Sequence, residues 1–159
     1  MRTNQILPSL AILASLAGCA AFEPDYYNCN ALVTSYAQGA RASLISEATL
    51  QNVEVRFNGV SARCYDEDTD IIAEVGIGLK VSRELSEGQD VAPVSVPMLA
   101  AIIDEDDAVI SRESFVYTMQ FTNNLDVIYP LVRREFNVPQ GGRLILSLTP
   151  TLIGDEAGS

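Results

Sequence analysis

Hydrophobic and polar residues alternate along most of the chain with a period of two. The alternation is clearest in four runs, at residues 53–57, 73–82, 115–121 and 144–148. Successive side chains of a strand point to opposite faces, so each run predicts a β-strand with one face in a core. Residues 94–103 are almost continuously apolar. This run favours a strand buried on both faces, or one that starts at a sheet edge where Pro93 and Pro97 are tolerated.

Turn-forming residues separate these runs. They fall at residues 58–59, 66–70, 87–90, 104–107, 123–124 and 139–142. Between residues 31 and 48 the apolar spacing fits a helix, but Gly39 disfavours one, so we expect an initial strand followed by irregular edge structure. About seven strands with regular turns predict an all-β fold, an antiparallel immunoglobulin- or fibronectin-like β-sandwich. A small closed barrel is the alternative.

The N-terminus carries a different pattern. An apolar run follows Arg2 and ends in Leu16-Ala17-Gly18-Cys19. This resembles the lipobox of bacterial lipoproteins, which implies cleavage before Cys19 and a lipid on that cysteine. At about a dozen residues the run is shorter than the roughly 20 that a membrane-spanning helix needs. An ordinary cleaved signal peptide is the alternative.

Four segments follow from this interpretation. They are a signal peptide (1–18), a lipidated tether (19–28), the sandwich domain (29–152) and a flexible tail (153–159). The tether reaches at most about 30 Å, so we expect the domain to stay close to the membrane. Tyr26 and Tyr27 are expected to pack on the domain, with the lipid interface as the alternative. Ala20 follows the lipid cysteine, where aspartate would retain an enterobacterial lipoprotein in the inner membrane. That resemblance implies the periplasmic leaflet of the outer membrane.

The remaining cysteines predict a disulfide. Once Cys19 carries lipid, Cys29 and Cys64 are left with a single possible pairing. Exported proteins fold in an oxidising compartment, where a disulfide is the default. Closing a loop of this length is worth roughly 3–4 kcal/mol in the chain-entropy model. Metal binding needs more ligands than these two, and the chain contains no histidine.

Charge and composition exclude several function classes. The chain has 10 basic and 21 acidic residues and a net charge of −11, which disfavours nucleic acid and anionic lipid heads as partners. Without histidine there is no Ser-His-Asp or Cys-His arrangement, and no glycine-rich phosphate loop is present. Lys80 falls at a solvent-facing strand position, and Arg133-Arg134 is interpreted as an exposed spot on a strand. We therefore predict no enzymatic activity and no cofactor.

Two acidic turns raise a metal-binding alternative. Their carboxylates are Asp66, Asp68 and Asp70 in the first turn, and Asp104 and Asp106 in the second. Alternate carboxylates on one side of a loop are what calcium requires, and two such loops at one end of a sandwich could share an ion. The first turn is not an EF-hand, because Ile71 and Ile77 stand where its glycine and bidentate glutamate belong. Plain solvated hairpins are the preferred interpretation.

Several motifs beyond the lipobox carry a family resemblance. They are Cys29, residues 59–65 before an acidic turn, residues 96–104, and Val138-Pro139 followed by Gly141-Gly142. Together they are similar to a group of small alphaproteobacterial lipoproteins, which implies an immunoglobulin- or fibronectin-like sandwich in the cell envelope. The expected function is a non-catalytic envelope lipoprotein that contacts another envelope protein or has a structural role. A calcium-binding module and a hydrolase with an unusual site are the alternatives.

Overall fold

Two β-sheets packed face to face make up the fold, so the predicted all-β sandwich is confirmed. The computed structural model describes residues 24–45, 52–84, 93–122 and 125–149. Seven strands in these ranges have five or more residues: β3 (Arg41–Ile45), β4 (Asn52–Glu67), β5 (Asp70–Arg83), β6 (Pro93–Ile103), β7 (Val109–Gln120), β9 (Leu131–Pro139) and β10 (Arg143–Leu148). Three are shorter: β1 (Tyr27–Asn28), β2 (Val33–Ser35) and β8 (Val127–Ile128).

Sheet A is built on the long antiparallel pair β4 and β5. One edge of β4 carries β1 and β3, and the far edge of β5 carries β8 and β9. Asn58 and Gly59, residue types that can form either a turn or a bulge inside a strand, form a bulge, because the register shifts between Phe57 and Val60. Gly59 has φ +120°, a left-handed value that glycine adopts without strain.

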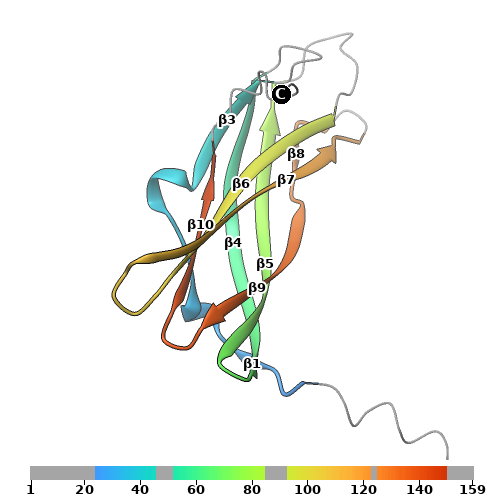
Figure 1. The fold of residues 1–159 in the computed structure, drawn as a ribbon. Helices are drawn as coiled ribbons and strands as arrows, with labels where there is room; N and C mark the ends of the chain where they lie inside the picture. The colour runs from blue at the N-terminus through green and yellow to red at the C-terminus, as the bar shows by residue number, and fades with distance from the viewer. Residues whose placement is uncertain (1–23, 46–51, 85–92, 123–124, 150–159) are drawn as a thin grey trace, which may run out of the picture.

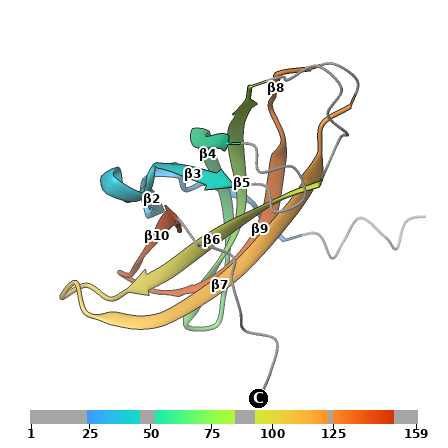
Figure 2. The same cartoon turned by 90° about the horizontal axis from the view of Figure 1, so that it is seen from above.

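Sheet B has the strand order β2-β10-β6-β7 (Figures 1 and 2). All its pairs are antiparallel except β2 with β10. The ladder between β6 and β10 begins at Met98, so Pro93 and Pro97 lie in the part of β6 before it, as the edge interpretation expects. Among the seven longer strands, the second and third are β4 and β5, and they share a sheet. In an immunoglobulin domain the second and third strands lie in opposite sheets.

The core lies between the sheets and is filled by the inward positions of the alternating runs. On β5, Ile77, Leu79 and Val81 are fully buried, and Leu144 and Leu146 of β10 face them from the other sheet. Outward positions of β5 from Glu74 onward, including Lys80, are half-buried, so the strand alternates as the period of two predicts. Burial of one side chain in two is therefore what fixes the strand registers.

Residues 31–45, the described part of the segment 31–48, depart from the prediction in one respect. Two 3-10 turns, η2 (Asn30–Leu32) and η3 (Ala37–Gly39), flank β2, and the chain then crosses to sheet A. The expectation of irregular structure is wrong for Arg41–Ile45, which form the regular strand β3. Ala42 and Leu44 are buried there while their neighbours are exposed, a period of two that the helical spacing masked. Gly39 packs under β10, where a Cβ atom would lie 1.8 Å from the Ser147 hydroxyl oxygen.

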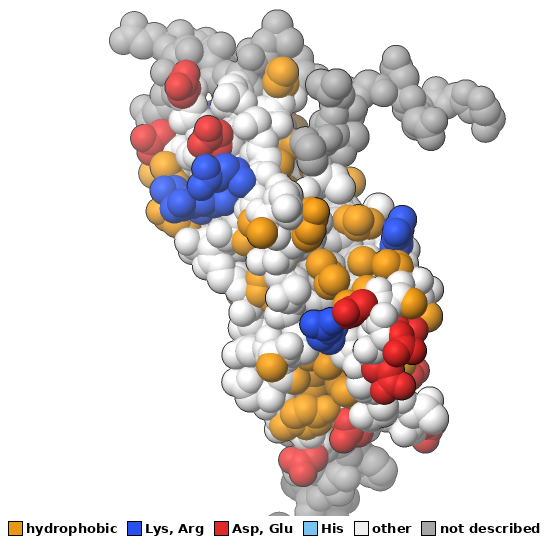
Figure 3. Space-filling view, turned by 90° about the vertical axis from the view of Figure 1, so that its left-hand side faces the viewer, with side chains coloured by type: hydrophobic (Ala, Val, Ile, Leu, Met, Phe, Trp, Pro, Cys, Tyr) orange, Lys and Arg blue, Asp and Glu red, His pale blue; other side chains and the backbone are white. Residues whose placement is uncertain are grey.

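The outer faces of the two sheets differ in character. On sheet B, half-buried apolar residues face outward at Pro97, Leu99, Ala101 and Ile145, beside the exposed Val116. On sheet A, the outward positions of the central strands are mostly charged or glycine. Figure 3 shows one side of the molecule, with hydrophobic side chains across the middle of the view and Lys and Arg gathered at the upper left.

Candidate functional site

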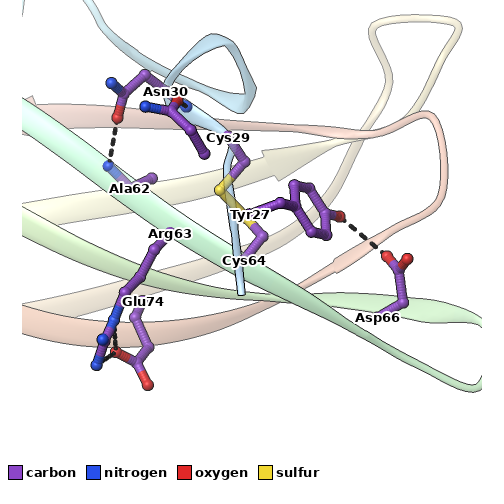
Figure 4. Close-up of a disulfide and its surroundings, with 9 residues drawn as sticks. Tyr27, Cys29, Asn30, Ala62, Arg63, Cys64, Asp66 and Glu74 are labelled. Carbon is purple, nitrogen blue, oxygen red and sulfur yellow. Dashed lines mark hydrogen bonds and ion pairs between the residues drawn. A yellow bond between two sulfur atoms is a disulfide. The ribbon is translucent and has the colours of Figure 1, made fainter. Parts of the chain in front are cut away.

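The N-terminal segment is fastened to β4 by several independent contacts (Figure 4). We call this region, residues 26–30 with their partners on β4 and β5, the N-terminal anchor. The predicted lipidation residue Cys19 lies outside the described residues. The domain contacts begin at Tyr26 and Tyr27, before the predicted boundary at Cys29, because both tyrosines hydrogen-bond to sheet A.

A disulfide joins Cys29 to Cys64, which confirms the predicted pairing. Their Cα atoms are 5.8 Å apart. Cys64 is fully buried on the inward face of β4, and Cys29 is half-buried against the core. Next to the crosslink, β1 adds only two residue pairs, Tyr27 with Cys64 and Asn28 with Arg63. The covalent bond is therefore the strongest connection between the N-terminal segment and the sandwich.

Asn30 continues the fastening beyond the end of β1. Its side-chain oxygen accepts a hydrogen bond of 2.7 Å from the backbone N–H of Ala62. Its own backbone N–H donates to the Asn28 side chain at 3.1 Å. The edge of β4 has no strand partner at Ala62, so the Asn30 amide supplies the acceptor that a neighbouring strand would offer. The sequence gives no signal for this contact, because Asn30 and Ala62 are distant along the chain.

Tyr26, Arg63 and Glu74 form a cluster on the outer face of sheet A. The Tyr26 hydroxyl and the Arg63 Nε–H both donate to the Glu74 carboxylate, each at 2.6 Å. The Arg63 guanidinium also lies 4.3 Å from the centre of the Tyr26 ring. The two hydrogen bonds stabilise the charged carboxylate and lower the pKa of Glu74, and the same carboxylate raises the pKa of Tyr26.

Tyr27 is held on the other side of β1. Its hydroxyl donates to the Asp66 carboxylate at 2.9 Å, and desolvation together with this hydrogen bond raises the pKa of Tyr27. Tyr26 meets Tyr65 edge to face, with ring centroids 5.4 Å apart. The expectation that both tyrosines pack on the domain is confirmed.

The acidic turns lie in the same half of the molecule as the N-terminal segment, the lower half of Figure 1. In the first turn, Asp66 accepts from Tyr27, and Asp68 adopts a left-handed φ of 52°. In the second, Asp104 accepts hydrogen bonds from the backbone N–H groups of Asp106 and Ala108, at 3.0 and 2.9 Å. These contacts shape hairpin turns.

The predicted calcium ligands do not assemble into a common site. Within the described ranges, which include Asp66, Asp68, Asp70, Asp104 and Asp106, no three acidic or cysteine side chains come close enough to hold a metal ion. Asp107 instead pairs with Arg143. The geometry gives the calcium alternative no ligand set.

A groove of about 720 Å³ lies beside the N-terminal anchor on the outer face of sheet A. Ser61 and Arg63 line one wall, Arg133 and Glu135 the other, and Gly76 forms the floor between them. A Cβ atom at Gly76 would lie 2.9 Å from the Ser61 hydroxyl, so a larger residue there would displace that hydroxyl. The walls carry charges of both signs.

The two adjacent arginines have different environments. Arg133 faces outward into the groove, as predicted for an exposed spot. Arg134 points the opposite way, because strand side chains alternate, and forms an ion pair with Glu113 of β7 in sheet B. Its guanidinium lies 4.8 Å from the centre of the Phe115 ring. The prediction of an exposed pair therefore missed that Arg134 bridges the edges of the two sheets.

No protein-family model matches this chain, and no significant similarity to a curated protein or to a solved structure was found. In the part of the chain that the structure describes, no helix has the length and apolar character to span a bilayer.

Proposed function

We propose that this chain is a non-catalytic cell-envelope lipoprotein. A lipid on Cys19 would hold it at the periplasmic face of the outer membrane, where the sandwich serves as a protein-interaction or structural module. The lipobox-like sequence supports lipidation of Cys19. The N-terminal anchor supports a firm attachment of the lipidated segment to the sandwich.

The observation that carries the proposal is how soon the chain becomes fastened after Cys19. Tyr26 already hydrogen-bonds to Glu74, and it follows Cys19 by seven residues. Seven residues span at most about 25 Å when fully extended. A lipid on Cys19 would therefore keep the sandwich within a short distance of the bilayer.

The disulfide suits the anchor to bear tension from the membrane. The two backbone pairs of β1 alone would separate easily if the lipid pulled the segment away from β4. The Cys29–Cys64 bond passes such a force directly into β4, which is paired along most of its length with β5.

Charge would then orient the domain. The acidic turns share an end of the sandwich with the N-terminal segment, so this end would face the membrane. Carboxylates are repelled by anionic lipid head groups. The sandwich would stand away from the surface and leave the outer face of sheet A, with its groove, accessible to a periplasmic partner.

The direct test is Cys19→Ser in cells, followed by membrane fractionation and metabolic labelling with palmitate. The wild-type protein should label and sediment with the outer membrane, whereas the variant should lose the label and either leave the membrane or accumulate unprocessed. Cys29→Ser is the matched control, because it removes one thiol without touching the lipobox, and it should still label. A Cys19→Ser protein that is processed and membrane-bound like the wild type would refute the proposal.

A further inference from the structure

Three cationic side chains form a straight row on the outer face of sheet A. Arg41 of β3 pairs in register with Arg56 of β4, and Arg56 pairs with Lys80 of β5. Their sequence neighbours Ala42, Val55 and Val81 are buried, so the three cations point outward. Adjacent strands are about 4.8 Å apart, and the row therefore spans about 10 Å. We call these three residues the basic row.

The basic row lacks the acidic partners that other arginines of the domain have. Arg63, Arg134 and Arg143 each form an ion pair. Among the described residues, none of the three cations of the basic row forms an ion pair or a side-chain hydrogen bond. The nearest acid on the same face, Glu54, stands in the next register row between Ser43 and Ser82.

This arrangement is unfavourable for folding. Like charges directly opposite each other on neighbouring strands destabilise a sheet, and the basic row contains two such contacts. The chain has 21 acidic residues and only 10 basic ones, so placing three of the latter in register is contrary to its composition. Folding alone gives no reason for the row, whereas recognition of an anion does.

The row borders a shallow hollow of about 180 Å³, to which Glu54 and Ser82 also contribute. Two guanidinium groups offer bidentate donors that match phosphate oxygens, and the ammonium adds a compact charge. A single carboxylate would leave two of the three charges unmatched. A long polyanion would instead meet the negative charge of the rest of the domain, which is screened only beyond about 8–10 Å.

We infer that the basic row binds a compact anion with two or more phosphate charges. This chemistry occurs in soluble compounds that contain pyrophosphate, and also in lipid head groups that end in a phosphomonoester, although the net negative charge of the domain disfavours an anionic membrane surface. The row lies about eight residues along β4 from the disulfide, in the half of sheet A away from the N-terminal anchor. The site is therefore separate from the anchor and does not depend on the proposed function.

The test uses the full-length protein in a nonionic detergent, titrated with pyrophosphate in a calorimeter at low salt. We expect saturable binding that weakens as salt is added, and an affinity at least about tenfold lower in Arg56→Gln, because the central charged donor is lost. Arg112→Gln is the matched control, since Arg112 is a lone exposed arginine on the outer face of sheet B. It should bind like the wild type, and thermal unfolding verifies that both variants fold.

A second arm distinguishes the sources of phosphate. Full-length Cys19→Ser protein, which cannot be held by lipid, is sedimented with vesicles of phosphatidylcholine, with and without phosphatidic acid. The site is assigned to a lipid head group if the Cys19→Ser protein sediments only with vesicles that contain phosphatidic acid, and if the double variant Cys19→Ser, Arg56→Gln does not sediment with them. Binding of pyrophosphate without vesicle binding assigns it to a soluble compound. Absence of both, or equal binding by wild type and Arg56→Gln, overturns the inference.

Discussion

The two halves of β4 use charge in opposite ways. In the half that bears the N-terminal anchor, Arg63 has a carboxylate partner in Glu74 and an aromatic partner in Tyr26. In the other half, Arg56 has cations on both sides and no acid in its register row. Both halves pair with the same strand, β5, and both alternate between buried and exposed residues.

Charges that are paired within the domain and charges that are left unpaired therefore occur on the same sheet face. The Arg63–Glu74 pair helps to hold a segment that must stay attached, and it matches the cation of β4 with a carboxylate, although Glu74 also stands opposite Glu135 of β9. The basic row destabilises the sheet in isolation, so its charges are retained for something outside the domain. Substitutions at Arg56 and at Arg63 should therefore change the free energy of unfolding in opposite directions.

The largest effect is expected where the anchored half is crosslinked. Cys64→Ser should lower the free energy of unfolding by about 2–5 kcal/mol, because the crosslink is lost and a hydroxyl replaces sulfur at a fully buried position. Urea denaturation of the variant measures this, and reduced wild-type protein should lose a comparable amount. A loss below about 1 kcal/mol would mean that the anchored half does not depend on the disulfide.

A smaller effect, of opposite sign in the two halves, should come from one pair of substitutions. Arg56→Thr should raise the free energy of unfolding by about 0.2–1 kcal/mol at low salt, because two like-charge contacts disappear. The gain should shrink as salt screens the repulsion. Arg63→Thr should lower stability, since it leaves Glu74 with one partner fewer. Urea midpoints at two salt concentrations test both, and a destabilising Arg56→Thr would contradict the comparison.

These two halves also mark the limit of what the sequence predicts. The alternation of apolar residues from 73 to 82 predicted β5 and its buried face, and the cysteine count predicted the Cys29–Cys64 pairing. The strand prediction rests on local periodicity, and the disulfide prediction rests on elimination among three cysteines. Neither prediction requires knowledge of how the strands align. The lipid on Cys19 stays a prediction.

Register is what the sequence could not supply. Arg41, Arg56 and Lys80 each look like an ordinary outward residue, and only the alignment of β3, β4 and β5 brings them into one row. The same holds for the Tyr26 hydrogen bond to Glu74, which joins residues 48 positions apart. For the acidic turns, spacing suggested shared ligands, but hairpin hydrogen bonds determine where those carboxylates lie.

The smallest effect concerns pH in the anchored half. The pKa of Glu74 is lowered from its ordinary value of 4.5, so its contribution to stability is present above that value and is lost as pH falls through the lowered pKa. Glu74→Gln should therefore melt at a lower temperature than wild type near pH 7, and the difference should vanish in strong acid. Thermal melts across this range test the assignment, and a difference that persisted unchanged at low pH would contradict it.

A single peptide analysis can test whether a lipid on Cys19 is connected to β4 through the disulfide of the N-terminal anchor. Protein isolated from the envelope without reduction is digested with trypsin, which cuts after Arg41, Arg63 and Lys80. Mass spectrometry should find residues 19–41, lipidated on Cys19, joined through a disulfide to residues 64–80. A peptide that begins before residue 19, an unmodified Cys19, or free thiols at Cys29 and Cys64 would contradict the account.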